Sequence, residues 1–398
     1  MYPQVKVITE DYSTIVSQNQ AINAFYAGHF ERGPVGEITQ ISSIYDFKIT
    51  FGKPTNSNQS EWFQIYNYFL YNNSSIYIVR TGAKESSKAR WGDISAKYPG
   101  EYGNSLRVVC QGNQIHTFLS NKLVETIAIG ESSYYIDYPD SITECDCKLT
   151  GGFHAEPTAQ DIADAYEIGN TGDLDFDFIL ANSLYEAPAI QLGESKLAIA
   201  FVYNPQNTNC ICYNGTKKQK SIFTGKTIEV PILGDALGMR CNLANSEGLS
   251  ESHCKRNYKL NSIESANILN LKELYAKNIN SIAKDTDSGG YYFYSETLGN
   301  GNTLTQELIL NRLKKESSEF ARYFVFEMND ELTRNEFKKK ITALCQSYKD
   351  NRYITDFLVV CNETNQIIEP NSLICDISVK MAGIIEVVSI RLKAVSEI

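Results

Sequence analysis

Cysteine and histidine are the residues of this 398-residue chain whose types could hold a metal ion. Two cysteine pairs have a single residue between their members, Cys145 with Cys147 and Cys210 with Cys212. Further possible ligands follow in the sequence: Cys241, His253 and Cys254. Zinc sites usually have about two to four residues between paired ligands, whereas alternate residues of a strand share one face, which is also an ordinary core pattern. We therefore predict buried free thiols in a reducing compartment and no bound metal.

The four histidines do not lie in a pattern typical of an activated nucleophile. None stands beside a serine or cysteine in a Gly-x-Ser-x-Gly turn. The sequence has neither a Gly-x-x-x-x-Gly-Lys-[Ser/Thr] phosphate loop nor a Gly-x-Gly-x-x-Gly turn after a strand. We predict that the protein is not an enzyme, with no catalytic residues and no cofactor.

The overall charge argues against a nucleic-acid partner. The formal net charge is -10, and hydrophobic and charged residues make up 42% and 21% of the chain, as in ordinary globular proteins. Wrapping nucleic acid needs clustered lysine and arginine. No apolar run approaches the roughly 20 residues that cross a bilayer, and the first residues lack the features of a signal peptide. We expect a protein of cytoplasmic origin that makes no direct nucleic-acid contact and does not insert into membranes.

The elements that would position any site follow an α/β pattern in the first part of the chain. In order, we predict a strand at 21–27, a helix from Ser42 or Ser43 to about Gly52, a helix at 61–71 capped by Ser60, and a strand at 76–80. The stretch 106–150 is expected to be rich in short strands.

The middle of the chain continues this pattern. Thr158 with Asp161 predicts a helix start, and the apolar runs 176–181 and 197–203 are short enough for buried parallel strands. The polar stretch 207–227 is expected to be a loop. The spacing of the apolar residues predicts a helix at 264–275.

The last third is the most regular. Strands are predicted at 290–294, 322–327 and 354–361, and a helix at 304–320. Thr333 and Glu336 have capping-box spacing. The helix they would open has an apolar stripe formed by Phe337, Ile341, Leu344 and Cys345.

Both ends of the chain carry extended patterns. Residues 373–379 alternate between apolar and polar types, residues 381–383 interrupt the alternation, and a second alternation includes Val388, Ile390 and Leu392. Near the start, Val5 and Val7 flank Lys6. A terminal strand with an apolar face must pair its edge, either in its own domain or in a neighbour's sheet.

Several stretches together resemble the tail sheath proteins of contractile bacteriophages, over nearly the whole chain. The residues that carry the resemblance are Ala24–Gly28 with Arg32–Glu37, the motif Ala-Lys-Tyr-Pro-Gly-Glu-Tyr-Gly-Asn at 96–104, Leu149–Gly152, Phe326–Asp330 and Ile354–Cys361. Two positions depart from the family pattern. His154-Ala155 stands where Asp-Gly is usual, and Lys380-Met381-Ala382 stands where the family has Lys-Pro-Ala.

The resemblance implies an α/β fold (α+β overall) in which core sheath domains are flanked by extended arms that act as donor strands. The donor-strand residues would be Val5, Val7, Val388, Ile390 and Leu392. The implied domains are an N-terminal arm at 1–20, N-terminal and central α/β domains at 21–285, a conserved C-terminal domain facing an inner tube at 286–380, and a C-terminal arm at 381–398.

The function implied by the resemblance is that of a structural subunit. Such subunits form stacked hexameric rings, a helical sheath around a tail tube, and contract to drive the tube through the host envelope. The implied partners are other copies of the chain, the tail tube protein, and the baseplate and tail terminator proteins. The implied location is the virion tail, assembled in the host cytoplasm.

Basic residues near the predicted helix start are candidates for the contact with the tube: Arg334, Lys338 and Lys339. A solvated helix face is the alternative explanation of that cluster. Two alternatives for the whole chain also stay open. One is the sheath of a phage-derived bacteriocin or extracellular contractile injection system, and the remote one is a subtilisin-like or other α/β enzyme.

Overall fold

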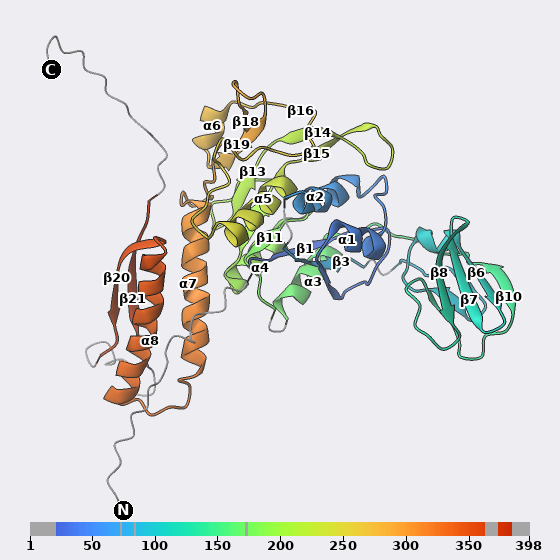
Figure 1. Cartoon of the computed structure of the whole chain (residues 1–398), viewed down its shortest axis with the longest axis horizontal. Coiled ribbons are helices and arrows are strands. Elements are labelled where there is room, and N and C mark those ends of the chain that lie inside the picture. The colour runs from blue at the N-terminus through green and yellow to red at the C-terminus, as the bar shows by residue number, and fades with distance from the viewer. Residues whose placement is uncertain (1–20, 72–73, 83–84, 172–173, 363–372, 384–398) are drawn as a thin grey trace, which may run out of the picture. The chain divides into compact units, whose positions relative to one another are not determined.

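The computed structural model describes residues 21–71, 74–82, 85–171, 174–362 and 373–383 (Figure 1). The chain divides after Leu308 into two compact units, which we describe separately. The domain boundary predicted from the sequence lies at 286, and that domain assignment stays a prediction. Among the described helices, none is both long and apolar enough to cross a membrane.

A seven-stranded sheet forms the centre of the first unit, in the order β17-β13-β12-β11-β1-β3-β2. Every neighbouring pair is parallel except β2 with β3. The strands are β1 (Ala24–Gly28), β2 (Ile38–Ile41), β3 (Ile76–Arg80), β11 (Phe178–Leu180), β12 (Ile199–Val202), β13 (Ile211–Tyr213) and β17 (Ile279–Asn280). The predicted strands at 21–27, 76–80, 176–181 and 197–203 all lie in this sheet.

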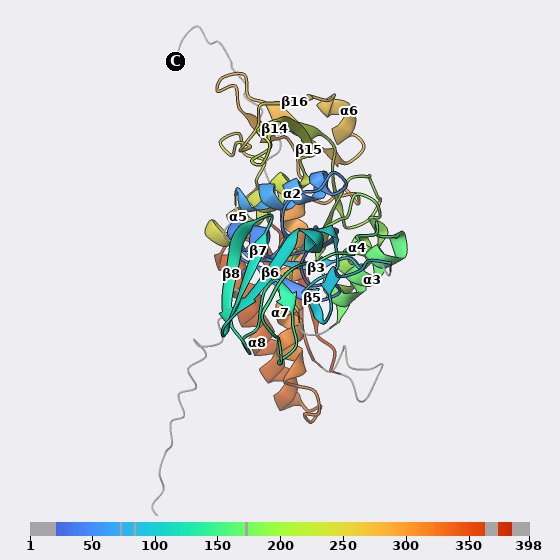
Figure 2. The ribbon, with the colours of Figure 1, turned by 90° about the vertical axis from the view of Figure 1, so that its right-hand side faces the viewer.

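Helices cover both faces of this sheet, which is why its inner strands β1, β11 and β12 are apolar at every position. In β1, Ala24 and Tyr26 face one core and Phe25 and Ala27 face the other. The first core also contains residues of α1 (Ile44–Phe51), α2 (Gln59–Phe69) and α5 (Leu233–Ser246). The second core contains residues of α3 (Ala159–Asn170) and α4 (Ala187–Lys196), and Figures 1 and 2 show the two helix layers on opposite sides.

Local capping signals account for some of the helix starts. The Ser43 hydroxyl accepts the Asp46 N–H at 3.1 Å at the start of α1, and Thr158 with Asp161 forms the capping box of α3. The predicted cap at Ser60 is wrong, because α2 begins one residue earlier, at Gln59, and Asn58 is its N-cap residue.

Helix α5 packs very closely on α2. A Cβ atom added at Gly234 would lie 2.2 Å from the Gln64 carbonyl oxygen, and one added at Gly238 would lie 2.4 Å from that of Tyr68. Because these glycines are four residues apart, they lie on one face of the helix. Only a residue without a side chain allows the two backbones to approach this closely.

A β-rich module between residues 87 and 153 has its own apolar core. One sheet runs β10-β6-β7-β8 and another β4-β5-β9. The strands are β4 (Arg90–Trp91), β5 (Ile94–Ala96), β6 (Leu106–Gln111), β7 (Gln114–Leu119), β8 (Lys122–Ala128), β9 (Ile136–Asp137) and β10 (Cys145–Lys148). The predicted β-rich section is therefore present, and the 96–104 motif enters it through the short helix η2 (Glu101–Ser105).

The expected loop at 207–227 is wrong, because this stretch contains β13, β14 (Thr216–Lys220) and the first residue of β15 (Thr227–Pro231). Strand β14 has a polar sequence but a buried face, on which Lys217 is fully buried. The Lys217 ammonium donates to Asp235 Oδ1 at 2.7 Å and to the Asn261 carbonyl at 2.8 Å. A buried ion pair thus replaces the apolar pattern on which strand prediction relies.

The predicted helix at 264–275 is mostly wrong. Its first part forms β16 (Ser265–Ala266), which pairs with β14, and the helix itself is limited to α6 (Leu271–Tyr275). Ile268 and Tyr275, two of the apolar residues whose spacing predicts the helix, are 43% and 42% exposed. The remaining strands of the unit, β18 (Ile282–Lys284) and β19 (Tyr291–Phe293), form a hairpin that includes the predicted strand at 290–294.

The second unit contains most of α7 (Leu304–Arg322), then α8 (Glu331–Asp350), β20 (Ile354–Val360) and β21 (Asp376–Met381). The predicted strand at 322–327 is wrong, because α7 continues to Arg322 and the chain then turns. The predicted capping box is also wrong. Asp330 is the N-cap residue of α8, its carboxylate accepts the Thr333 N–H at 2.9 Å, and Thr333 lies inside the first turn.

Candidate assembly interface

The C-terminal sheet consists of β20 and β21, which run antiparallel with Val360 opposite Asp376 and Phe357 opposite Val379. Within the described part of the chain, no third strand joins this sheet. Each of the two strands therefore has an outer edge at which a further strand could add by backbone hydrogen bonds.

Helix α8 and the strand pattern give this sheet two different faces. The predicted stripe of α8, Phe337, Ile341, Leu344 and Cys345, is buried. In β21 the apolar Ile377 and Val379 are half-buried, while the intervening polar residues are exposed, as the alternation predicts. The sheet thus has one face packed and one face toward solvent, the usual arrangement of an antiparallel sheet.

The candidate tube-contact residues do not share one environment. The Arg334 guanidinium donates to the carbonyl and the side-chain oxygen of Asn329, both at 3.1 Å, and so turns back onto the loop before α8. Lys338 is half-buried and Lys339 is exposed. The third lysine of the run, Lys340, is 3.7 Å from Glu336 Oε1 and lies over the Phe324 ring. Of the three candidates, Lys339 is the most accessible.

An apolar corner between α7 and α8 was missed by the sequence analysis. Its large side chains are strongly exposed: Tyr323 80%, Val325 61%, Phe326 103%, Met328 77% and Leu332 79%. A hollow of about 790 Å³ beside them is lined in part by Phe324, Phe337 and Leu373. The aromatic and β-branched run predicts a strand at 322–327, although the same composition suits an exposed contact surface.

The five predicted donor-strand residues, Val5, Val7, Val388, Ile390 and Leu392, lie outside the described residues. The chain segments that carry them directly precede and follow the described part. The structure therefore shows the sheet edges but not their partners.

The ten cysteines are all free thiols, and most are buried. Burial raises the pKa of Cys147 and that of Cys212 to about 12 in each case. A buried neutral thiol reacts slowly at neutral pH, because the thiolate is the nucleophile and the metal ligand.

One buried cluster combines the types of side chain that bind zinc: His253, Cys254 and Glu296. The Tyr213 hydroxyl and His253 Nε2 are 2.6 Å apart, and two hydroxyls donate to the Glu296 carboxylate, those of Ser252 and Thr305. Burial alone would raise the pKa of Glu296, but His253 and Arg240 hold it below its usual value. Since Arg240 is fully buried beside the cluster and already supplies positive charge, a divalent cation would be poorly compensated there. We expect elemental analysis to find less than one zinc per chain, and a full equivalent of zinc would contradict this.

A pair of histidines connects the central sheet to the β-rich module. The rings of His29 and His154 are 3.9 Å apart, and His154 Nδ1 is 3.2 Å from Arg80 Nη2. Arg80, at the end of β3, is fully buried and donates to carbonyl groups of both parts, those of Phe30, Gly33 and Pro99. Burial, with the nearby charge of Arg80, lowers the pKa of both histidines to about 4. His154, which stands where the resembling family usually has aspartate, thus contacts both His29 and Arg80.

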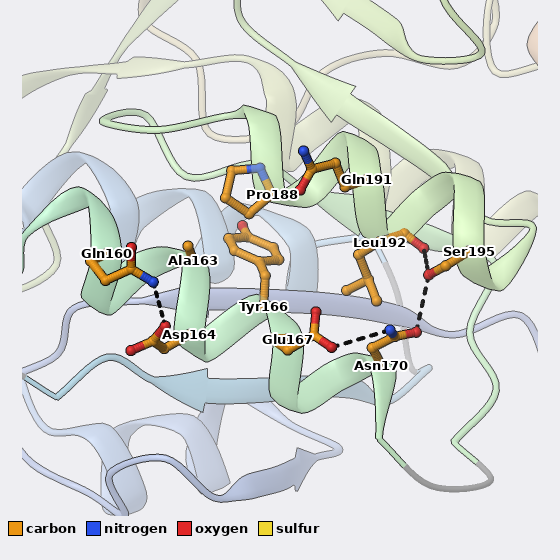
Figure 3. A pocket seen from close by; sticks show the side chains of 10 residues that line it. All are labelled: Gln160, Ala163, Asp164, Tyr166, Glu167, Asn170, Pro188, Gln191, Leu192 and Ser195. Atoms are coloured by element: carbon orange, nitrogen blue, oxygen red, sulfur yellow. Dashed lines mark hydrogen bonds between the residues drawn. The ribbon is translucent and has the colours of Figure 1, made fainter.

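A shallow hollow of about 320 Å³ between α3 and α4 holds no nucleophile with a base beside it (Figure 3). Its one serine, Ser195, donates to Asn170 Oδ1 at 3.1 Å and to the Leu192 carbonyl at 3.0 Å. The described residues that line it include no histidine, lysine or cysteine. Nothing in this hollow resembles a hydrolytic triad.

Comparison with known proteins relates this arrangement to one class of assembly. Residues 307–394 match the family model described as the phage tail sheath C-terminal domain. A stretch of 91 residues is 40% identical to the tail sheath protein of Vibrio phage KVP40 (isolate Vibrio parahaemolyticus/Japan/Matsuzaki/1991) and covers 22% of this chain. It spans 14% of the length of the phage protein.

Solved structures extend the likeness from the C-terminal part to the whole fold. The sheath tail protein Lin1278 from Listeria innocua is 13% identical with a TM-score of 0.67, covering 91% of this chain and 95% of that one. The contracted helical sheath of the anti-feeding prophage is 13% identical with a TM-score of 0.60, and the match covers 94% of this chain and 93% of that one. Residues 307–394 therefore match the phage tail sheath C-terminal domain, and the chain has, over nearly its whole length, the fold of sheath proteins of contractile systems.

Proposed function

We propose that this protein is the structural subunit of a contractile tail sheath. The observation that carries the proposal is the C-terminal unit, which matches the sheath domain in sequence and has a two-stranded sheet joined by no third strand within the described residues. The amphipathic sequences at both chain ends supply strands that could complete such sheets in neighbouring copies.

Strand addition suits an assembly that changes shape while its subunits stay connected. The links consist of backbone hydrogen bonds along a sheet edge, and they persist when the bodies they connect rotate, provided that the connecting segments flex. Residues 13–19 and 381–383 are the proposed hinges. No nucleotide would be needed, because contraction would release energy stored in the extended assembly.

The proposed partners follow from the same assembly. Copies of the chain would form stacked hexameric rings around a tail tube, and the sheath ends would contact baseplate and tail terminator proteins. The particle would be assembled in the host cytoplasm and act as a virion tail that drives the tube through the host envelope. The protein would have no enzymatic activity, in line with the sheath proteins that it resembles.

Electron microscopy of the purified full-length protein tests the proposal. We expect long tubes or shorter, striated, collapsed cylinders. A protein that stays monomeric under all conditions, including mixture with its tube protein, would refute the assembly function.

A sheath of a bacteriocin or extracellular injection system is the second candidate. The observation behind it is the likeness in fold to a sheath complex of an extracellular contractile injection system. The gene neighbourhood separates the two. Capsid and terminase genes beside this gene would indicate a phage, and their absence beside tube and baseplate genes would indicate an injection system.

A further inference from the structure

Two thiols face each other where the C-terminal sheet ends. Val360 lies opposite Asp376 as the last paired residues of the sheet, and Cys361 and Cys375 are the residues that adjoin this pair on the two chain segments. The Cys375 thiol hydrogen-bonds to that of Cys361. Directly opposed residues of antiparallel strands have the short separation that a disulfide requires.

The other cysteines do not form an equivalent pair. Cys110 and Cys145 are also opposite each other, in β6 and β10. However, the side chain of Cys145 hydrogen-bonds to Cys147, two residues along the same strand. The Cys110–Cys145 pair is therefore an internal comparison, in which the two residues are opposite each other but the thiol contacts differ.

The surroundings give the two C-terminal thiols different roles. Cys361 is 1% exposed, whereas Cys375 is half-buried and accessible to a small reagent. Burial raises the pKa of Cys361, although the Cys375 hydrogen bond and the charges of Arg334 and Lys338 oppose this. Burial raises the pKa of Cys375 to about 12. Oxidation should therefore be slow at neutral pH and faster as the pH rises, because thiolate is the reacting form.

We propose that Cys361 and Cys375 are a disulfide-forming site, which stays reduced while the subunit is in the host cell and becomes oxidised after release. The oxidant is a small disulfide such as oxidised glutathione. The Cys375 thiolate attacks it, forms a mixed disulfide and releases one small thiolate. The Cys361 thiolate then attacks the Cys375 sulfur and releases the second, and the two protons from the cysteines end on the two small thiols.

The bond would tie the outer ends of β20 and β21 together and close residues 362–374 into a loop. It would hold in register the sheet that, in the proposed function, accepts strands from neighbouring copies. Only the statement that the bond forms after release from the host cell rests on that proposed function. The chemistry depends on the two thiols alone and can be tested on unassembled protein.

The test uses the reduced full-length protein treated with oxidised glutathione at pH 8, followed by alkylation and mass spectrometry. We expect the loss of two hydrogen atoms per chain, a peptide in which Cys361 and Cys375 are cross-linked, and restoration of both thiols by dithiothreitol. The rate should be severalfold greater at pH 9 than at pH 7.5. A product in which both residues remain alkylated, or in which Cys375 keeps glutathione, would overturn the proposal.

Single variants distinguish this pair from its neighbours. Cys375→Ser should abolish the cross-link and leave Cys361 alkylated, whereas Cys345→Ser, which removes a buried cysteine nearby on α8, should leave the cross-link intact. A Cys345–Cys375 linkage, or earlier linkage of Cys110 with Cys145, would contradict the assignment. The result does not depend on whether sheaths form. Failure of the disulfide proposal can therefore be told apart from failure of the proposed assembly function.

Discussion

Lys217 and Asp235 form an ion pair in which neither side chain is exposed to solvent. The Tyr71 hydroxyl also donates to Asp235 Oδ1, at 2.7 Å. Two charges removed from water are tolerated because each has its partner and further hydrogen bonds.

Removing one member of this pair should therefore be far more costly than breaking an exposed pair. We expect Asp235→Ala to lower the free energy of unfolding by about 3–5 kcal/mol, since it leaves a buried ammonium without its counter-charge. Urea titration followed by circular dichroism measures this. The matched control is Glu273→Ala, which breaks the exposed pair with Lys277 and should cost about 0.5 kcal/mol or less. An equal loss of unfolding free energy in the two variants would show that burial does not decide the cost of breaking the pair.

The His29–His154 contact should make stability sensitive to acid. Both folded-state pKa values are about 4, below the usual 6.5, so the unfolded chain binds more protons between these values. The contribution of the two neutral histidines to the free energy of unfolding is present above about pH 6.5 and is lost as the pH falls toward 4. Unfolding midpoints from pH 7 to 4 should decline less steeply in His29→Gln/His154→Gln than in the wild type. Parallel pH profiles would show that the histidines are not responsible.

At the scale of elements, the C-terminal arm is the segment whose removal should separate folding from assembly. Deleting residues 387–398 should leave a soluble subunit with unchanged circular dichroism that cannot polymerise, because the alternating strand would no longer reach a neighbouring sheet. Electron microscopy and sedimentation measure the two properties. Full-length sheaths from the truncated chain would rule out the donor strand. Outright misfolding would show that the segment belongs to its own domain.

Elements with complete local signals were predictable, and those decided by distant residues were not. The α3 capping box and the buried stripe of α8 are determined by residues that lie close together in the sequence. The polar β14 strand depends on Asp235, which lies 18 positions after Lys217 and supplies the missing charge. The exposed residues near Phe326 are of the same aromatic and β-branched types that are common in strands. Composition alone therefore predicted the wrong element there.

The candidate interface was predictable only in outline. The sequence indicated the alternating β21 strand and its neighbour β20, but not the contacts of Arg334 with the loop before α8. The link between Arg80 and His154 joins residues 74 positions apart, and only tertiary structure brings them together. The relation to sheath proteins was predictable because the resemblance rests on motifs spread along the chain, and the comparisons confirm it.

For the whole molecule, the basic residues of α8 remain the candidate grip on an inner tube. We expect Arg334→Glu/Lys338→Glu/Lys339→Glu to weaken sheath assembly on tubes while the monomer stays folded. Contacts of this kind are weak singly and sensitive to salt, which suits a grip that must release. Cosedimentation with tubes at low and high salt measures the effect.

Two further variants make this test specific. Lys338→Glu/Lys339→Glu leaves the Arg334 contact with Asn329 intact, so it separates lost attraction from a disturbed loop. The charge-matched control reverses three exposed lysines of the first unit, Lys218, Lys220 and Lys226. Normal extended sheaths from the α8 triple variant would show that the tube is held elsewhere, for example at the apolar corner.

The Arg80 junction has a mechanical consequence. Its planar guanidinium binds carbonyl groups on both sides of the boundary between the central sheet and the β-rich module. A pull on the module would therefore load several bonds at once, instead of breaking them one after another. Tension applied to the module would pass into β3, an interior strand of the sheet. The junction would then act as a stiff coupling, so that the module and the sheet recoil together when a neighbouring subunit pulls.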